Sequence, residues 1–330
     1  MPNSKIFVIG GAGYVGSHFC LYAQDVGLDV CVFDNLSKGH KAALRCSEFV
    51  KGDLNDFQTV YRHLSSCSYD AIFHFAADAL VGESVANPSR YYKNNIIAAY
   101  NLLEAMRMTR HDRIIFSSSC AVYGYPDAIP IKETHPKNPV SPYGRTKLAM
   151  EWMLEDFHKA YGIKSASLRY FNAAGCEPSR GLGEDHSPES HLIPNVVKAT
   201  LGQAKEVVIF GNDYSTPDGT CIRDYIHVTD LAVAHVAAMN KLESIDFIQL
   251  NLGTGAGLSN REIVETISNV SGVKLIPIYS ARREGDPSEL VADSSRAREI
   301  LDWKPSRSGI ESIVKEVIQW FSENPKGYAK

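Results

Sequence analysis

The first half of the chain alternates short apolar runs with longer amphipathic stretches, and this alternation restricts the possible folds more than any other feature. The stretches at 14–26, 88–108 and 143–161 have helical length and mixed faces. The expected strands are KIFVIG (5–10), DVCVFD (29–34), EFVKGD (48–53), AIFHFA (71–76), RIIFSSS (113–119) and SASLRY (165–170). Alternating strands and helices are typical of a parallel sheet covered by helices.

This rhythm ends after RYFN (169–172), where a segment rich in Gly, Pro and acidic residues begins (173–190). We therefore expect an α/β protein with a doubly wound, parallel Rossmann-type sheet and a smaller mixed α/β domain for substrate. The dinucleotide-binding domain is expected at 1–172, rejoined by about 222–250. The substrate domain is expected at 173–221 and 251–330.

Composition excludes several classes of protein. A chain of 330 residues can bury a large core, and its net charge of -4 gives no reason to expect nucleic acid or an acidic membrane as partner. The seven cysteines are scattered without a CxxC pair, so neither a disulfide framework nor a zinc ribbon is indicated, and we expect no metal. A reducing cytoplasm fits best. No signal peptide or membrane span is recognised.

A glycine-rich turn, VIGGAGYVGSH (8–18), follows the first expected strand and opens the first helix. Gly10, Gly13 and Gly16 allow a tight turn and close approach to a pyrophosphate at the helix N-terminus, although such turns also exist for packing. Asp34 closes the second strand, where a carboxylate accepts bonds from an adenosine ribose and repels a 2′-phosphate. NAD is therefore favoured over NADP. Asp34 also fits a plain turn aspartate, as does Asp53 in GDL (52–54), which could flank the adenine.

The stretch SPYGRTK (141–147) places Tyr143 and Lys147 four residues apart, on one face of an expected helix. An isolated tyrosine and lysine with this spacing usually lie on the protein surface and have no catalytic role. Here it follows the fifth strand, whose end carries Ser119, and it accompanies the glycine loop. We therefore interpret Tyr143 as an acid/base whose pKa is lowered by the Lys147 ammonium and a nicotinamide ring, with Ser119 steering the same substrate hydroxyl.

The motifs together resemble those of the extended short-chain dehydrogenase/reductase superfamily and, within it, the UDP-glucose (UDP-galactose) 4-epimerase family. The resemblance runs essentially from end to end. The matching pieces are GGAGYVGSH (10–18), FDNLSKG (33–39), HFAA (74–77), VGESV (81–85), YYKNN (91–95), SSSCAVYG (117–124), SPYGRTKLAME (141–151), LRYFNAAG (168–175), IFGNDYSTPDGTCIRDYIHVTDLA (209–232) and ARREGDP (281–287).

The resemblance implies a role for each matching residue. It makes Tyr143 the acid/base, Lys147 its electrostatic partner and a ribose ligand, and Ser119 the substrate-hydroxyl partner. The implied NAD-lining residues are Gly10, Gly13, Tyr14, Val15, Gly16, Asp34, Asn35, Asp53, Leu54, Phe75, Ala76, Asn94, Ser117, Tyr143, Lys147 and Tyr170. The implied nucleotide-sugar residues are Ser119, Tyr143, Asn172, His191, Leu192, Phe210, Arg223, Arg283, Asp286 and Leu290. Without the resemblance, Phe210 also fits a core position and Arg223 a local pair with Asp224.

The implied activity is a redox-neutral isomerisation of a UDP-sugar at C4 in galactose and related carbohydrate metabolism. Related dehydratases need a carboxylate just before VYG, where this chain has Cys120 and Ala121, so dehydration is disfavoured. The resemblance also places Leu290 at a gatekeeper position, where a tyrosine would exclude N-acetyl groups, so some turnover of UDP-N-acetylhexosamines is expected; the alternative is that Leu290 simply packs in the core. Other UDP-sugar 4-epimerases, including those for pentoses, and a non-catalytic NAD sensor remain alternatives.

The resemblance also implies a homodimer joined through the helices near 88–108 and 143–161. Three positions depart from common family patterns: Ile9 in place of threonine, Ala79 in place of a ribose-contacting lysine, and His191 in place of asparagine.

Overall fold

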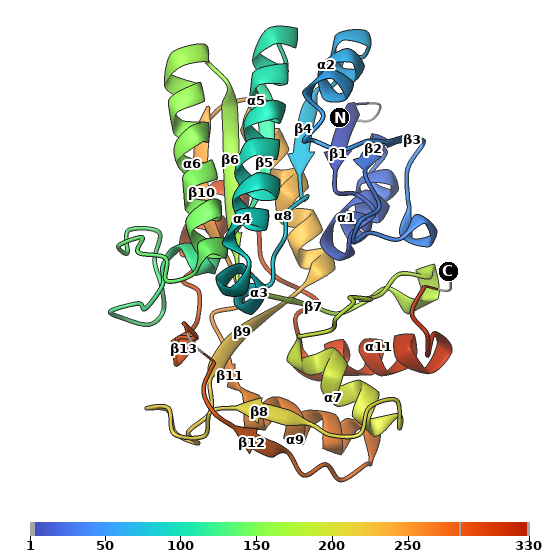
Figure 1. The fold of residues 1–330 in the computed structure, drawn as a ribbon, viewed down its shortest axis with the longest axis vertical. Coiled ribbons are helices and arrows are strands. Elements are labelled where there is room, and N and C mark those ends of the chain that lie inside the picture. Colours follow the sequence, from blue (N-terminus) through green and yellow to red (C-terminus); the bar gives the residue numbers. More distant parts are fainter. Residues whose placement is uncertain (1–3, 284, 329–330) are drawn as a thin grey trace.

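The computed structural model describes residues 4–283 and 285–328, and its centre is a seven-stranded sheet (Figure 1). Every neighbouring pair in this sheet is parallel, in the order β10-β6-β5-β4-β1-β2-β3. The strands are β1 (Lys5–Ile9), β2 (Asp29–Asp34), β3 (Glu48–Lys51), β4 (Ala71–His74), β5 (Arg113–Ser119), β6 (Lys164–Tyr170) and β10 (Phe247–Leu252). The six strands expected from the sequence all lie in it, and the expected doubly wound α/β fold is confirmed.

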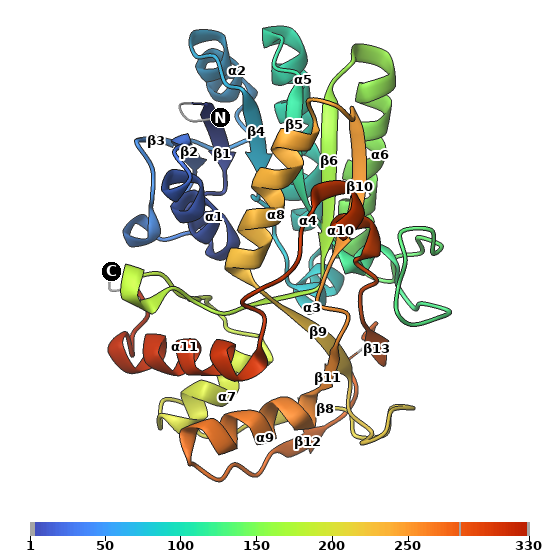
Figure 2. The ribbon, with the colours of Figure 1, turned by 180° about the vertical axis from the view of Figure 1, so that it is seen from behind.

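Helices cover both faces of this sheet, because an α-helix connects each pair of successive strands except β2 and β3. One face packs against α2 (Phe57–Ser66), α5 (Ala98–Thr109) and α6 (Pro142–Tyr161). The other packs against α1 (Tyr14–Asp25), α8 (Val228–Lys241) and α10 (Ser295–Leu301), as the reverse view shows (Figure 2). The inner strands are buried on both sides, which explains their continuous apolar runs, whereas the edge strand β3 is only partly covered.

The strand order reverses between β1 and β4, and this position places the functional segments. In open parallel sheets a crevice forms outside the carboxyl ends of the strands at such a reversal. Gly10 follows β1, Asp34 ends β2, Phe75 follows β4 and Ser119 ends β5. Residues far apart in the sequence therefore meet at one edge of the sheet.

A smaller body lies beyond this edge (Figure 1). Its sheet centres on β9 (Ile222–His227), which pairs with β7 (Asn172–Ala174), β11 (Gly257–Ser259) and β13 (Glu289–Leu290). A second pair joins β8 (Val208–Phe210) to β12 (Ile278–Ser280). Helices α7 (Leu192–Thr200), α9 (Asn260–Ser271) and α11 (Ile310–Glu323) enclose its hydrophobic core, which includes the fully buried Trp320. The chain thus returns from β9 in the smaller body to α8 and β10 in the larger one.

The helix expected at 88–108 is present, but it contains a π-helical segment. After the short α3 (Val81–Ala86), it runs as α4 (Pro88–Tyr92), a π-helical segment (Lys93–Ile97) and α5. By contrast, α6 is regular: the Ser141 side chain accepts a hydrogen bond from the Gly144 N–H at its start, and Gly162 ends it in the left-handed conformation. Short 3₁₀ turns occur at Lys41–Ala43, Cys120–Val122 and Pro178–Arg180.

No helix among the described residues is both long and apolar enough to span a lipid bilayer.

Candidate active site

The glycine-rich turn after β1 brings the start of α1 close to the segment that follows β4. Gly10 has a φ of +80°, and a Cβ at this residue would lie 2.5 Å from the Ala76 nitrogen. Only glycine fits both the conformation and the space. The first N–H groups of α1, which begins after Gly13, have no side-chain cap. They are therefore available to an anionic group in the crevice.

A cleft opens along this edge of the sheet. Nine of the residues expected to line a cofactor surround it: Gly10, Gly13, Asp34, Asn35, Asp53, Leu54, Phe75, Ala76 and Asn94. Asp34 is buried at the end of β2, and its two carboxylate oxygens accept hydrogen bonds from Ala12 N (3.0 Å) and Leu36 N (2.7 Å). Burial raises the pKa of Asp34, while these two bonds act in the opposite direction. They also fix the carboxylate at the cleft.

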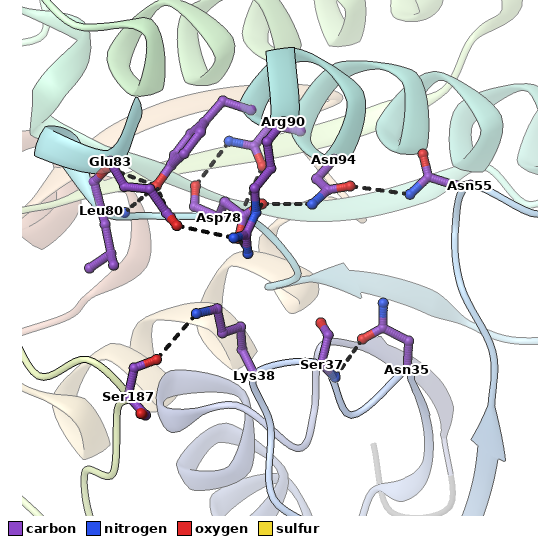
Figure 3. Close-up of polar contacts among 12 residues, drawn as sticks. Asn35, Ser37, Lys38, Asn55, Asp78, Leu80, Glu83, Arg90, Asn94 and Ser187 are labelled. Carbon is purple, nitrogen blue, oxygen red and sulfur yellow. Dashed lines mark hydrogen bonds and ion pairs between the residues drawn. The ribbon is translucent and has the colours of Figure 1, made fainter. Parts of the chain in front are cut away.

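Polar side chains lie on both sides of this cleft, as Figure 3 shows. Asn35, Ser37 and Lys38 form one side, and Asp78, Asn94 and Asn55 form the other. Asn35 also donates to Asp53 Oδ2 (3.0 Å). Burial acts to raise the pKa of Asp53, but hydrogen bonds from Asn55 and Asn35 outweigh it and lower the pKa. The loop after β2 and the loop after β3 are thereby joined.

The sequence analysis missed the Asp78 network. Asp78 receives a bidentate ion pair from Arg90 (Nε to Oδ2 3.0 Å, Nη2 to Oδ1 2.7 Å) and a hydrogen bond from Asn94 Nδ2 (2.6 Å) (Figure 3). Arg90 also donates to Glu83 Oε1 (3.0 Å). This network stands beside Ala79, one of the three positions at which the sequence departs from the expected pattern. The charged side chains of Glu83 on α3 and Arg90 on α4 fix this side of the cleft, whereas Ala79 has no polar side chain to contribute.

Tyr143 and Lys147 lie one turn apart near the start of α6, facing the end of β5. The Lys147 Nζ lies 5.8 Å from the centre of the Tyr143 ring and donates a 2.8 Å hydrogen bond to the Ser117 carbonyl. Ser117 Oγ in turn contacts the Tyr170 hydroxyl. Ser119, at the end of β5, accepts from Ala121 N (3.2 Å) and also interacts with the Tyr143 phenol. The structure therefore brings together five of the residues expected at the site: Ser117, Ser119, Tyr143, Lys147 and Tyr170.

Without a bound cofactor, the pKa of Tyr143 shifts in the direction opposite to the one expected from the sequence. Burial raises the pKa of the Tyr143 phenol, with the Ser119 interaction acting in the opposite direction. Burial also lowers the pKa of Lys147 to about 7, against the charge of Glu151. Burial therefore disfavours the charged form of both groups. A further positive charge beside the phenol is needed to make it acidic.

The expected nucleotide-sugar residues lie in the smaller body. Arg223 on β9 is buried and pairs with Asp286, while its Nη2 also donates to the Pro287 carbonyl (2.8 Å). The alternative pair with Asp224 is wrong, because the Asp224 carboxylate instead accepts from Thr254, Gly255 and Ala292. The Arg283 guanidinium lies 4.0 Å from the centre of the Phe210 ring, and this ring is only partly buried.

The remaining expected residues occupy different surroundings. Asn172 begins β7 and faces Tyr225 of β9 in register. Leu290 pairs in register with Arg223 and packs in a hydrophobic cluster with Cys120, the residue after Ser119. Val15 packs against a hydrophobic core of the larger body and Leu192 against that of the smaller body. Tyr14 donates a 2.6 Å hydrogen bond to the Gly175 carbonyl, which connects the glycine loop to the segment after β7.

His191 takes part in a cluster that the sequence analysis did not anticipate. Its Nδ1 lies 2.8 Å from Glu189 Oε1 and 2.8 Å from Glu184 Oε1. His186 lies against the same two carboxylates. The four residues come from one irregular segment before α7, which has no periodicity from which their convergence could be read.

Comparison with known proteins places this arrangement in a family. A dinucleotide-type cleft beside a tyrosine–lysine pair defines a protein of the extended short-chain dehydrogenase/reductase kind. The model for a family described as GDP-mannose 4,6 dehydratase matches residues 7–317. A UDP-glucose 4-epimerase of Halalkalibacterium halodurans is 48% identical over 98% of this chain and 97% of its own length.

Two solved structures are similar throughout. The UDP-glucose 4-epimerase of Brucella ovis, crystallised in complex with NAD, superposes with a TM-score of 0.92 at 46% identity, covering 96% of this chain and 97% of that one. The UDP-Glc/GlcNAc 4-epimerase of Campylobacter jejuni has a TM-score of 0.85 at 41% identity, covering 97% and 99%. The chain belongs to the UDP-glucose 4-epimerase family.

Proposed function

We propose that the protein inverts C4 of a UDP-hexose, converting UDP-galactose to UDP-glucose through a transient 4-keto sugar with NAD as cofactor. The observation that carries this proposal is the position of Tyr143, Lys147 and Ser119 at the carboxyl edge of the sheet, beside a cleft of dinucleotide type. The membership of the chain in the UDP-glucose 4-epimerase family supports the same activity.

The residues around the cleft fit NAD. The close approach at Gly10 leaves room for a diphosphate against backbone N–H groups, and the α1 N-terminus is positive there. The fixed carboxylate of Asp34 suits ribose hydroxyls and disfavours a 2′-phosphate. Lys147 and Tyr170 stand at the other end, near Ser117. When bound, NAD supplies the hydride acceptor and donor for C4, and its positive ring favours the phenolate of Tyr143.

The chain's own residues then move the proton and hold the sugar nucleotide. Tyr143 takes the proton of the 4-hydroxyl and returns a proton to the 4-keto oxygen after the sugar has turned its other face to the cofactor, while Ser119 orients that oxygen. Phe210 offers a ring face to the uracil, Arg223 and Arg283 offer guanidinium groups to the diphosphate, and Asp286 offers a carboxylate to the ribose. Asn172, His191 and Leu192 complete this proposed site. Most of these contacts are to the nucleotide, so the sugar remains free to rotate relative to the diphosphate.

Dehydration, the activity in the description of the matching family model, needs an additional acid/base group. The residues after Ser119 are Cys120 and Ala121, which form a 3₁₀ turn with Val122. Cys120 is buried, and burial raises the pKa of its thiol to about 12. Neither side chain can supply a proton for eliminating water from the sugar. The site therefore favours epimerisation.

A second substrate class is supported by Leu290. This residue is buried beside Cys120, close to the end of β5, and its side chain is shorter than a tyrosine. We expect turnover of UDP-N-acetylglucosamine besides UDP-galactose. Replacing Leu290 with Tyr should lower kcat/KM for the N-acetyl substrate by about tenfold or more, relative to UDP-galactose, because it fills the space for the acetamido group. A Leu290→Met control should change neither; equal loss on both substrates would contradict the gatekeeper role.

The direct test incubates purified protein with UDP-galactose, UDP-N-acetylgalactosamine and UDP-xylose in separate reactions, without added cofactor. We expect UDP-glucose from the first, because the cofactor returns to its oxidised state in each cycle. Release of a 4-keto-6-deoxy sugar, or no product after NAD is added back, would overturn the proposed reaction. Product from UDP-xylose alone would support the pentose alternative.

We also propose a cytoplasmic homodimer in which the larger body holds the dinucleotide and the smaller body the UDP-sugar. The seven unpaired cysteines suit a reducing compartment. Several large apolar side chains are exposed on the two long helical stretches expected to form the interface: Tyr92, Ile97, Tyr100, Met108, Trp152 and Tyr161. Monomeric proteins rarely expose so many on neighbouring helices, which supports the dimer.

A further inference from the structure

Four metal-ligating side chains converge just before α7, outside the proposed catalytic groups. They are Glu184, His186, Glu189 and His191, and one ligand atom from each lies within 4.8 Å of all the others. Two imidazoles and two carboxylates form a common ligand set for zinc and neighbouring transition metals. The set carries two negative charges when the imidazoles are neutral, which matches a divalent cation.

The histidine–glutamate distances in this cluster are close to those between ligands of one central ion. His186 Nδ1 lies 3.1 Å from Glu184 Oε1 and 3.6 Å from Glu189 Oε2. His191 Nδ1 lies 2.8 Å from Glu184 Oε1 and from Glu189 Oε1. A tetrahedral ion with bonds of about 2.0–2.2 Å separates its ligand atoms by about 3.3–3.6 Å. The two shorter contacts need to open by only about half an ångström.

Two of the ligand atoms form no hydrogen bond. His186 Nδ1 and Glu189 Oε2 are buried and lie 3.6 Å apart, and the nearest carboxylate oxygen to His186 Nδ1 is Glu184 Oε1 at 3.1 Å. The Glu189 side chain is only 6% exposed. Within the described residues, neither Glu184 nor Glu189 forms an ion pair with lysine or arginine. Buried polar groups without partners are costly, and a cation between these two would satisfy both.

The surrounding contacts hold the segment in position. Lys38 Nζ donates to the Ser187 carbonyl (3.3 Å), as Figure 3 shows, and Tyr328 N donates to Asp185 Oδ2 (2.9 Å). The edge of the Tyr14 ring meets the His186 ring with the centres 5.8 Å apart. The ligands therefore come from a segment already fixed against the glycine loop. His191, 45% exposed, leaves a path for an ion to enter.

We propose that Glu184, His186, Glu189 and His191 form a binding site for one divalent transition-metal ion, with Zn²⁺ as the best match. The ion ties together the segment that runs between the glycine loop and α7. The role is structural, because all four protein ligands are used and none remains for a reacting group. The proposal reassigns the His191 side chain, because an imidazole bound to the ion cannot also contact the UDP-sugar; it does not otherwise depend on the epimerase reaction. The expectation of no metal rested on the spacing of cysteines, and this site contains none.

The test measures Zn²⁺ binding to untagged, chelator-treated protein by isothermal titration calorimetry and elemental analysis. A Cys46→Ser, Cys67→Ser background removes the two cysteines that are not buried, which could bind zinc adventitiously. We expect one saturable Zn²⁺ per chain. Glu189→Gln and His186→Gln should each weaken binding by about tenfold or more. The matched control His135→Gln, on another loop, should leave it unchanged.

Two spectroscopic readouts accompany these titrations. Co²⁺ in the same site should give the intense visible absorption of tetrahedral coordination, and hydrogen exchange in 184–191 should slow when Zn²⁺ is added. Circular dichroism confirms that each variant is folded. Absence of saturable Zn²⁺ binding, or equal binding by Glu189→Gln, His186→Gln and the control, would overturn the proposal. In that case the four residues form a cluster of two imidazolium–carboxylate pairs.

Discussion

Tyr143 and Lys147 show how burial and charge oppose each other at the scale of single residues. Both groups are buried, so each favours its neutral form: the pKa of the phenol is raised and that of the ammonium is lowered to about 7. The spacing of the pair could be read from the sequence, but this balance could not, because it depends on the depth of the site. The phenolate needs the positive charge of the bound cofactor.

Replacing Tyr143 with Phe separates an enzyme from a non-catalytic NAD sensor. The change removes only the hydroxyl, so the fold and the binding of NAD and UDP should persist. We expect kcat to fall by about 10²–10⁴-fold, because the general base is lost. The measurements are initial rates with UDP-galactose and calorimetric binding of UDP. Tyr125→Phe, at an exposed tyrosine, is the control. Unchanged turnover in Tyr143→Phe would exclude this residue as the acid/base.

At the scale of elements, a buried ion pair joins β6 to α6 directly behind this pair. Arg169, on β6, is fully buried and donates to both carboxylate oxygens of Glu151 on α6, at 2.8 and 2.6 Å. Ser118 on β5 also donates to Glu151 (2.6 Å). The pair therefore fixes the helix that carries Tyr143 and Lys147 against the strands that carry Ser117 and Ser119.

Breaking this pair should be strongly destabilising. Arg169→Met leaves the Glu151 charge buried without compensation, which costs about 3–5 kcal/mol. Adding Glu151→Gln should recover most of the loss, because the charge is gone and Ser118 keeps its acceptor. Urea denaturation measures both free energies of unfolding. Lys159→Met, which breaks the exposed pair with Glu155 on the same helix, should have no measurable effect. Equal stability of the single and double variants would contradict this explanation.

The elements differ in how far the sequence predicts them. The six strands and α6 follow from apolar runs, a serine cap and a terminal glycine, which are local signals. The π-helical segment at Lys93–Ile97 has no such signal, because its residues have the pattern of an ordinary helix. It turns Asn94 toward Asp78 at the cleft and buries Asn95, which donates to Thr146 on α6 (3.0 Å). The Asp78–Arg90 pair and the Glu184–His191 cluster likewise depend on folded contacts.

At the scale of the whole molecule, the exposed apolar side chains of α5 and α6 belong to the proposed dimer interface. Trp152 is 58% exposed on α6, on the helix layer that carries Ile97 and Tyr100. A charge at the centre of such an interface opposes its burial in a dimer. We expect Trp152→Glu to weaken dimerisation by about tenfold or more in sedimentation velocity. Ile276→Glu, at a more exposed residue (79%) in the smaller body, should leave association unchanged. A monomeric parent protein would refute the proposed dimer.

Acid stability is also a property of the whole fold, because three buried histidines remain neutral in it. Burial lowers the pKa of His18 and His235 to about 4 and that of His74 to about 3. The unfolded chain binds these protons near pH 6.5 and the folded chain does not. The free energy of unfolding therefore falls as the pH falls from about 6.5 to about 4, by about 1.4 kcal/mol per pH unit for each histidine.

His235 allows this contribution to be tested without disturbing the proposed catalytic groups. Its ring lies on α8 with its centre 4.9 Å from that of Phe75 and 5.9 Å from that of Phe19, surroundings that suit a phenyl ring. His235→Phe should remove one of the protons that the unfolded chain binds and the folded chain does not. The free energy of unfolding should then fall less steeply below pH 6.5, by about 1.4 kcal/mol per pH unit. Urea denaturation between pH 4.5 and 8 gives the slope. A His135→Phe control on a surface loop should keep the parent slope, and an unchanged slope in His235→Phe would show that His235 is protonated in the folded chain.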